Sequence, residues 1–447
     1  MMQLPEPRPF GRCRAALGGV LLSLSVGVVY GYPLDGDGES GIRRLEGYRI
    51  AQSLPSGAKL TPGALLDSEQ IELRLSNRDI QDFDTSPEDP ELAQALRTLF
   101  AGRDPSYALV VVDFSDPESI RWAGLRPDTR QNVGSVGKVI TMTGLFHALA
   151  QAFPDVADRQ RVLSTTVVRG GNWVVGDEHA VPRLDPDTQR NQFARLRESD
   201  EFRLSEWIDH AVSASANGAA SVVWREAILL RAFGDRYPVS FEESEAFFDA
   251  TPKAQLTAMA QAIMIEPLVA IGIDPERMRQ GSFWTRTSQQ RVPGVTSYAT
   301  PRELARWMFR LEQGRIVDRW SSLELKKYLY ITKRRYRYVY APELNSSAAF
   351  FKSGSLYSCV PEEGYRCARY MGNGRNFMNS VATIESPAGE PEVLYTVAMI
   401  SNVLKFNSAW DHSRFAAAIH EMITTRTVAT VREEAAAGEI EAVTRSD

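Results

Sequence analysis

The stretch SVGKVITMTGLFHALAQAF, residues 135–153, decides how this chain is interpreted. From Val136 to Phe153 it is strongly apolar and free of proline, which predicts a buried helix. Ser135 stands at the start of that helix and Lys138 follows three positions later. Because residues i and i+3 lie on one face of a helix, the lysine amine is expected beside the serine hydroxyl. We therefore predict that Ser135 is a nucleophile and that Lys138 is its general base.

Two further short motifs follow in the chain, Ser215-Ala216-Asn217 and Lys352-Ser353-Gly354. Ser215 is expected to relay a proton to a leaving nitrogen, and Asn217 to bind a substrate amide through its side chain. Burial and a neighbouring cation, for which Lys352 is the natural candidate, are expected to lower the pKa of Lys138. The positive end of the helix that begins at Ser135 would favour negative charge on a reacting carbonyl.

Each motif is weak alone, and the chain contains a second Ser-x-x-Lys sequence at residues 56–59. That sequence lies between Pro55 and Pro62 with no helical pattern after it, so no chemistry is assigned to it.

In this order the three motifs resemble the S-x-x-K, S-D-N and K-T-G motifs of class A β-lactamases and penicillin-binding proteins. Residues 107–113 and 123–128 are similar to the first two strands of that family. Residues 297–305 are similar to its helix start after the Ω-loop. The resemblance covers about residues 90–427, with longer separations between motifs than a compact class A enzyme would have. Insertions are therefore implied.

The resemblance implies a serine hydrolase that forms an acyl-enzyme at Ser135. The resemblance also implies that the backbone N–H groups of Ser135 and Ser355 form the oxyanion hole. Ser353, Gly354 and Ser355 then belong to the substrate-binding strand. Two positions depart from the family pattern: Ser353 replaces threonine and keeps the hydroxyl, whereas Ala216 replaces aspartate and removes a carboxylate.

A third departure concerns deacylation. Class A enzymes resemble one another in an Ω-loop Glu-x-x-Leu-Asn, whose glutamate activates the water that releases the acyl group. Residues 218–297 contain no asparagine, so that motif is absent from this stretch. Glu266 and Glu276 are the nearest candidates, by position alone. The sequence thus predicts acylation without efficient hydrolysis.

The remaining patterns place the other elements. The segment Thr300-Pro301-Arg302-Glu303 has a capping residue, a proline in the first turn and a glutamate three positions after the cap, which predicts a helix ending near Gly314. In all, helices are expected over 91–100, 136–153, 300–313 and 413–425 and through most of 202–272, and strands over 107–114, 119–125, 348–351, 380–385 and 393–401. Strands at both ends with helices between them predict an α+β, β-lactamase/transpeptidase-like fold, with an antiparallel sheet built from both ends of the chain and an inserted helical lobe.

The chain divides into four parts in this interpretation. Residues 1–31, in which arginines precede an apolar run, are expected to be a signal peptide or an N-terminal anchor. Residues 32–90 are expected to be a loosely structured extension, 91–427 the catalytic domain and 428–447 a polar tail. The protein is therefore expected to be exported, to the periplasm or beyond the cell.

An oxidising compartment would allow a disulfide between Cys359 and Cys367, which lie eight positions apart. Two free thiols remain the alternative, because sequence spacing does not fix the distance between Cα atoms.

Composition excludes some classes of protein. Hydrophobic residues make up 43% and charged residues 24% of the chain, which is ordinary globular composition. The net charge of −5 gives no reason to expect a nucleic-acid partner. The five histidines show no ligand spacing, and His420-Glu421 is followed by no second histidine, so neither a metal nor another cofactor is expected. The Tyr- and Arg-rich stretch 334–340 is expected to be a strand or a solvated edge rather than a binding patch.

The sequence therefore favours an exported serine acyl-hydrolase whose substrate is a small β-lactam or a cell-wall peptide. A D-alanyl-D-alanine peptidase, or another amidase or esterase, is the alternative among enzymes. A catalytically silent penicillin sensor or binding protein is the alternative outside them. The true substrate and the oligomeric state stay open.

Overall fold

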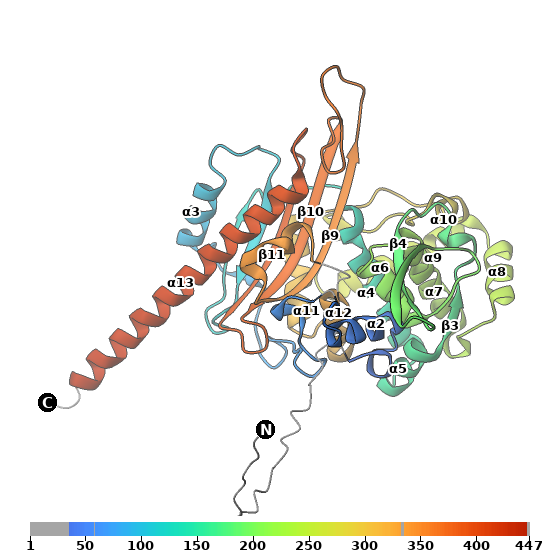
Figure 1. Ribbon diagram of the computed structural model, residues 1–447, viewed down its shortest axis with the longest axis horizontal. Coiled ribbons are helices and arrows are strands. Elements are labelled where there is room, and N and C mark those ends of the chain that lie inside the picture. The colour runs from blue at the N-terminus through green and yellow to red at the C-terminus, as the bar shows by residue number, and fades with distance from the viewer. Residues whose placement is uncertain (1–34, 58, 332–334, 445–447) are drawn as a thin grey trace, which may run out of the picture.

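A five-stranded antiparallel sheet lies at the centre of the molecule, and it is built from segments near both ends of the described chain (Figure 1). The computed structural model describes residues 35–57, 59–331 and 335–444, with side chains as far as residue 427. The strand order is β2-β1-β11-β10-β9. The strands are β1 (Ala108–Asp113), β2 (Arg121–Leu125), β9 (Ala348–Ser358), β10 (Arg375–Ser386) and β11 (Val393–Ser401). The predicted α+β fold with a sheet from both ends of the chain is confirmed.

Both faces of the sheet are covered, which explains why its strands are continuous apolar runs. In β1, Leu109 and Val111 point into one core, whereas Val110 and Val112 point into the other. Helices α3 (Pro90–Leu99) and α13 (Ser408–Thr444) pack on the first face. Helices α11 (Pro301–Glu312) and α12 (Arg319–Tyr330) pack on the second, between the sheet and the helical lobe (Figure 1).

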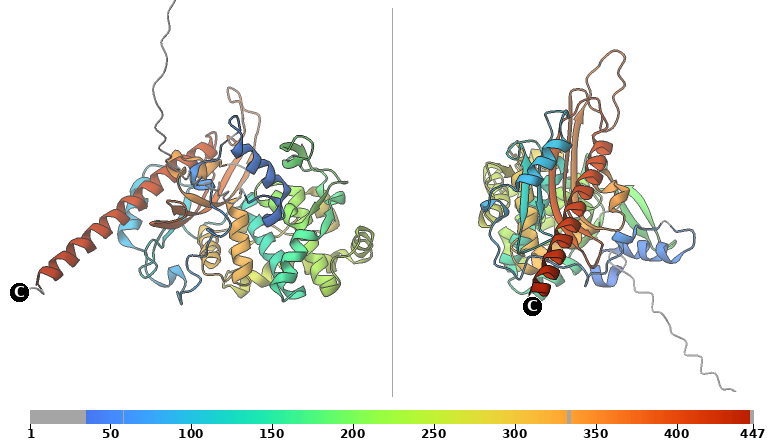
Figure 2. Two further views of the ribbon diagram at one scale, coloured as in Figure 1. Left: turned by 60° about the horizontal axis from the view of Figure 1, so that its bottom comes forward. Right: turned by 90° about the vertical axis from the view of Figure 1, so that its left-hand side faces the viewer.

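The helical lobe is inserted between β2 and β9 and lies to one side of the sheet in Figure 1 and in the left-hand view of Figure 2. Its central helix, α4, contacts α7 and α9 and is apolar on nearly every side, as expected for a helix surrounded by others. The lobe consists of α4 (Lys138–Ala152), α5 (Val156–Thr165), α6 (Leu204–Val212), α7 (Asn217–Phe233), α8 (Phe241–Ala250), α9 (Lys253–Ala270) and α10 (Arg286–Arg291).

Three small two-stranded sheets were not predicted from the sequence. They pair β3 (Val167–Arg169) with β6 (Glu201–Arg203), β4 (Ala180–Asp185) with β5 (Arg190–Arg195), and β7 (Met278–Arg279) with β8 (Tyr298–Ala299). These strands are short and largely polar, so they lack the apolar alternation by which a strand is recognised.

The start of α11 follows its sequence signature. The Thr300 hydroxyl accepts a hydrogen bond from the backbone N–H of Glu303 at 3.3 Å, and Pro301 occupies the first turn. The helix ends at Glu312, and Gly314 follows with a φ of 72°.

The last helix is longer than expected. The predicted helix over 413–425 runs instead from Ser408 to Thr444, so the stretch expected to be a polar tail continues as helix. Its Glu- and Ala-rich composition favours this conformation. In Figure 1 the far end of α13 projects beyond the sheet.

The segment 32–90, expected to be a loosely structured extension, contains two helices, α1 (Asp37–Ser40) and α2 (Arg43–Ser53). A buried ion pair holds α2 to the lobe: Nε of Arg44 lies 2.5 Å from Oδ2 of Asp209, and these side chains are 2% and 0% exposed. The Arg44 guanidinium also donates to the carbonyl of Ile331 at 2.8 Å. Ile42 and Leu45 also join the hydrophobic core of the lobe, but the ion pair depends on a partner 165 positions away, which hydrophobic periodicity could not reveal.

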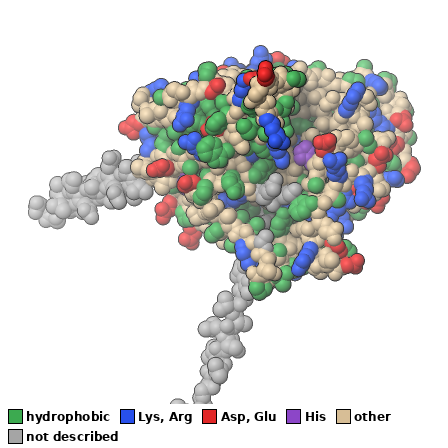
Figure 3. Space-filling view, turned by 45° about the horizontal axis from the view of Figure 1, so that its top comes forward, with side chains coloured by type: hydrophobic (Ala, Val, Ile, Leu, Met, Phe, Trp, Pro, Cys, Tyr) green, Lys and Arg blue, Asp and Glu red, His purple; other side chains and the backbone are tan. Residues whose placement is uncertain are grey.

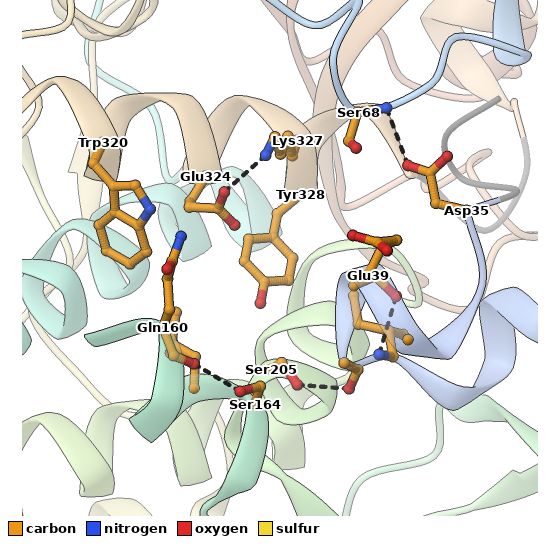
Figure 4. A pocket seen from close by; sticks show the side chains of 15 residues that line it. Asp35, Glu39, Ser68, Gln160, Ser164, Ser205, Trp320, Glu324, Lys327 and Tyr328 are labelled. Atoms are coloured by element: carbon orange, nitrogen blue, oxygen red, sulfur yellow. Dashed lines mark hydrogen bonds and ion pairs between the residues drawn. The ribbon is translucent and has the colours of Figure 1, made fainter. Parts of the chain in front are cut away.

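A polar cavity of about 390 Å³ remains where this segment meets α5 and α12 (Figure 4). At its walls Ser205 donates to the carbonyl of Gly41 at 2.8 Å, and the N–H of Ser68 donates to Asp35 at 3.0 Å. None of the motif residues lines this cavity.

The segment 1–31 lies outside the described residues, so a signal peptide or anchor stays a prediction. Within residues 35–57, 59–331 and 335–444, no helix combines the length and the apolar character needed to cross a bilayer.

On the face seen in Figure 3, acidic and basic side chains are interspersed.

Candidate active site

The start of α4 brings the first motif together. Ser135 lies in the 3₁₀ turn Gly134–Gly137, which leads directly into α4 at Lys138. The Nζ atom of Lys138 lies 3.0 Å from the Oγ atom of Ser135, which is the contact that the i, i+3 spacing predicts. Lys59 of the other Ser-x-x-Lys sequence instead donates to the carbonyl of Leu54 at 2.8 Å, near the end of α2.

The amine of Lys138 is buried among neutral groups. Besides Ser135, it donates to the carbonyl of Ser215 at 2.7 Å and to Oδ1 of Asn217 at 2.9 Å. Burial lowers the pKa of Lys138 to about 7, whereas the carboxylate of Asp177 acts in the opposite direction and the charge of Arg337 adds to the lowering. The sequence predicted that burial and the charge of Lys352 lower this pKa; burial is the main cause in the structure, and the lowering charge is that of Arg337.

Ser215 stands between the two lysines. Its Oγ atom accepts a hydrogen bond from Nζ of Lys352 at 2.9 Å and lies 3.5 Å from Nζ of Lys138. Its φ of 60° is left-handed, a conformation that a non-glycine residue rarely adopts outside functional sites and turns. Burial lowers the pKa of Lys352 well below its usual value, and the charges of Lys138 and Arg337 lower it further.

Gly354 lets strand β9 approach the nucleophile closely. A Cβ atom at this position would lie 2.2 Å from the carbonyl oxygen of Val133 and 2.6 Å from the backbone N of Ser135. A Cβ at Gly134 would in turn lie 3.4 Å from the backbone N of Ser355. The two segments that carry the predicted oxyanion donors therefore face each other.

Arg337 joins the site from the stretch expected to be a strand or a solvated edge. The 3₁₀ turn Arg337–Tyr340 replaces that strand, and Arg337 has a φ of 56°. Its guanidinium donates to the hydroxyls of Ser353 at 2.6 Å and Ser355 at 3.1 Å. Nothing in the local sequence signals this contact, because the two serines lie 16 and 18 positions further along the chain. The expectation of a strand or solvated edge over 334–340 is therefore wrong for Arg337–Tyr340, which form a turn that contacts the predicted site through Arg337. Arg334 lies outside the described residues.

Gln280 is a second residue that the sequence did not indicate. It lies between β7 and α10, is 3% exposed, and its Oε1 atom has no hydrogen-bond partner among the described residues. A Cβ built on Gly137 would lie 2.2 Å from this oxygen, so the amide packs against the nucleophile turn. Trp284, from the same segment, places its ring centroid 4.8 Å from Nζ of Lys138.

The two glutamates considered as replacements for the Ω-loop base lie elsewhere. Glu266 forms an ion pair with Arg231 at 2.7 Å, and both side chains are partly exposed. Glu276 is 74% exposed and lies 3.7 Å from Arg279. Neither has a contact with Ser135 or Lys138 within the described chain, which agrees with the weak support that the sequence gave them.

The predicted disulfide is present: Cys359 and Cys367 are bonded, with Cα atoms 5.9 Å apart. The bond closes the loop between β9 and β10, the hairpin that projects from the sheet in Figure 1. No group of histidine, cysteine, aspartate and glutamate side chains in the described residues could hold a metal ion.

All eight predicted site residues lie in this region: Ser135, Lys138, Ser215, Asn217, Lys352, Ser353, Gly354 and Ser355. Their catalytic and binding roles stay predictions.

Comparison with known proteins gives structural neighbours only. No protein-family model matches this chain. No curated protein matches it either. Solved structures similar to the chain include a β-lactamase from Sphaerobacter thermophilus DSM 20745, with 15% identity over 73% of this chain and 93% of that one, at a TM-score of 0.45.

Two other similar structures are a mutant of PBP-A and a class A β-lactamase. A mutant of PBP-A, solved as an acyl-enzyme complex with penicillin G, has 12% identity over 76% of this chain and 99% of that one, at a TM-score of 0.46. A class A β-lactamase described as the last common ancestor of Gram-negative bacteria has 18% identity over 74% and 98%, also at 0.46.

Proposed function

We propose that this protein is a serine acyl-hydrolase that forms an acyl-enzyme at Ser135 with β-lactams or with related amides such as cell-wall peptides. The observation that carries the proposal is the 3.0 Å contact between Nζ of Lys138 and Oγ of Ser135. The pKa of about 7 for the buried amine supports it, because near neutral pH about half of the amine is uncharged and can accept a proton.

In the proposed reaction Oγ of Ser135 attacks the amide carbonyl carbon while its proton passes to Nζ of Lys138. The carbonyl oxygen becomes negative and accepts hydrogen bonds from the backbone N–H groups of Ser135 and Ser355. The C–N bond then breaks as Oγ of Ser215 gives its proton to the leaving nitrogen. Protonated Lys138, whose Nζ atom lies 3.5 Å from that oxygen, passes on the proton taken from Ser135, while Lys352 donates a hydrogen bond to the same oxygen at 2.9 Å. The product is an ester of the acyl group with Ser135.

An anionic substrate fits the charge of the site. Arg337 supplies the positive charge, because burial lowers the pKa of both Lys138 and Lys352, and Arg337 forms no ion pair with a described residue. Arg337 presents a planar donor set, which suits a carboxylate. We therefore propose that the substrate carries a carboxylate near the scissile amide, as penicillins do.

Slow deacylation is part of the proposal. Lys138 donates only to neutral oxygens in the described chain, and Gln280, the buried polar side chain beside Gly137, cannot take a proton from water. A D-alanyl-D-alanine peptidase, or another amidase or esterase, would share the acylation step. A catalytically silent penicillin sensor or binding protein is the alternative that acylation without turnover would favour.

Mass spectrometry after incubation with benzylpenicillin tests the proposal. We expect the intact protein to gain the mass of the whole antibiotic, with the adduct mapped to Ser135, and Ser135→Ala to gain nothing. Decay of the adduct over minutes to hours would favour a hydrolase. An adduct that forms but does not decay would favour the silent sensor. An adduct that persists on Ser135→Ala would remove the central claim.

Export to the periplasm or beyond the cell also remains our proposal, with cleavage or retention of residues 1–31 undecided. N-terminal sequencing of the protein from a fractionated producing cell tests it. Recovery in the cytoplasm with residues 1–31 intact would contradict it.

A further inference from the structure

The Arg337 guanidinium is held on the substrate strand by a second residue, Tyr370. Arg337 donates to the hydroxyls of Ser353 and Ser355, which lie on either side of Gly354 in β9. The same guanidinium donates to the hydroxyl oxygen of Tyr370 at 3.1 Å. It also lies 4.9 Å from the centroid of the Tyr370 ring. Tyr370 therefore contacts Arg337 through both its hydroxyl and its ring.

No acidic side chain performs this task. Within the described residues Arg337 forms hydrogen bonds to three hydroxyl oxygens and forms no ion pair, and its Nε atom has no partner. Its positive charge is thus left available to a ligand, while neutral groups fix its direction. An arginine anchored by a carboxylate would already be neutralised and would attract an anionic substrate less strongly.

Tyr370 is itself fixed by its backbone. It has a left-handed φ of 64°, and its carbonyl accepts hydrogen bonds from the backbone N–H of Ser408 at 3.1 Å and the Ser408 hydroxyl at 3.3 Å. Two residues further on, the carbonyl of Gly372 accepts from the N–H of Lys405 at 2.9 Å. These bonds tie the end of the hairpin loop to the segment that precedes α13.

The disulfide closes the other side of the same loop. Cys359 and Cys367 are joined three residues before Tyr370. Val360 and Asn373 exchange two hydrogen bonds of 2.9 Å across the base of the loop. The loop between β9 and β10 is therefore closed on both sides. Tyr370 follows Cys367 by three residues along the chain and contacts Arg337, which in turn contacts Ser353 and Ser355.

We propose that Tyr370 is a positioning residue for Arg337, and that the Cys359–Cys367 disulfide, by closing the loop that carries Tyr370, maintains binding of a substrate carboxylate at Ser353 and Ser355. This inference rests on the proposed acylation of Ser135. It adds a specificity determinant outside the three motifs, and it links the oxidation state of the hairpin loop to recognition rather than to the chemical step.

Two matched probes separate positioning from general damage to the fold: benzylpenicillin, which carries a carboxylate, and its methyl ester, which does not. We expect Tyr370→Phe to lower the second-order rate of acylation by benzylpenicillin ~3- to 10-fold, the range for one lost hydrogen bond. The rate with the methyl ester should stay unchanged. Tyr340→Phe is the matched control, because this 68% exposed tyrosine lies in the same turn as Arg337. It should change neither rate.

The disulfide is tested in the same assay. The paired substitution Cys359→Ser with Cys367→Ser should lower the benzylpenicillin rate, again without a change for the methyl ester. Adding Tyr370→Phe to this variant should lower the benzylpenicillin rate by a smaller factor than it does in the protein with the disulfide, because both substitutions act through the position of Arg337. Thermal unfolding of each variant checks that it is folded.

The outcomes are distinct. Equal losses for the two probes in Tyr370→Phe, or no loss for either, would overturn the positioning role. Fully multiplicative effects of the cysteine and tyrosine changes would overturn the link to the disulfide. Absence of acylation of the wild-type protein by both probes would instead contradict the proposed function.

Discussion

The Nζ atom of Lys138 lies 3.0 Å from the Oγ atom of Ser135, and no carboxylate in the described chain donates or accepts at either of these atoms. The charge of this lysine is therefore controlled by burial more than by a partner. A buried amine with neutral hydrogen-bond acceptors loses its proton easily, which is the property that a general base requires. Asp177 is the carboxylate that opposes this loss, and it acts at longer range.

The first prediction concerns pH. Because the neutral amine is the base and its pKa is about 7, the rate of Ser135 acylation should rise with pH through about 7 and then level off. At pH 5 it should be on the order of 100-fold below the plateau, since two units below a pKa leave about 1% of the base form. Stopped-flow measurement of β-lactam acylation between pH 5 and 9 checks this.

A charge variant serves as the control for the pH prediction. Asp177 raises the pKa of Lys138, so Asp177→Asn should move the midpoint to lower pH. A flat profile in the wild-type protein, or a midpoint that moves upward in Asp177→Asn, would contradict the assignment of Lys138 as base.

The second prediction separates the two lysines. Lys138→Ala should reduce the acylation rate by ~10²-fold or more, as expected for a lost general base. Lys352→Ala should lower both the chemical step and the apparent affinity for a carboxylate-bearing β-lactam, because Lys352 contacts Ser215 and lies beside Ser353. Saturation kinetics of acylation give the two constants separately. Small and equal effects would support the silent binding protein.

The sheet and the eight motif residues could be predicted because their signals are local. An apolar run such as Val110 to Val112 indicates a strand wherever it occurs, and the i, i+3 spacing fixes the contact of Ser135 with Lys138. The sheet built from both ends of the chain was predicted from the order of the elements, strands at both ends with helices between them. Each of these inferences needed no knowledge of which distant residues touch.

Arg337 and Gln280 could not be predicted because their roles depend on distant contacts. Arg337 reaches Ser353 from a turn with a left-handed backbone, and its Tyr- and Arg-rich neighbourhood is equally typical of a solvated strand. Gln280 is an ordinary polar residue until the fold packs it against Gly137. The same applies to Arg44, whose partner Asp209 is 165 positions away.

The third prediction concerns deacylation. If Gln280 holds a water without taking its proton, benzylpenicillin should give a burst of one equivalent followed by slow turnover. Gln280→Glu places a carboxylate beside Gly137 and should speed the decay of the acyl-enzyme, by up to ~10²-fold for an added general base. Pulse acylation followed by mass spectrometry gives the decay rate.

Two surface glutamates are the controls for the deacylation prediction. Glu266→Gln and Glu276→Gln should leave both the burst and the decay unchanged, because neither carboxylate reaches the site. If the wild-type protein instead shows steady turnover without a burst, and this turnover is lost in either control, a displaced glutamate already activates water.

The fourth prediction tests whether α2 is an integral part of the catalytic unit. Asp209→Ala leaves the buried Arg44 guanidinium without its counter-ion, which should lower the free energy of unfolding by about 3–5 kcal/mol. Asp158→Ala removes a carboxylate from an exposed ion pair with Arg161 and should cost less than about 1 kcal/mol. Replacing both members of the buried pair, Arg44→Met with Asp209→Leu, should recover much of the loss because no charge is then left unpaired. Urea denaturation followed by tryptophan fluorescence measures all three. If Asp209→Ala costs no more than Asp158→Ala, α2 contributes little to the stability of the lobe, and the segment 32–90 would be an independent extension after all.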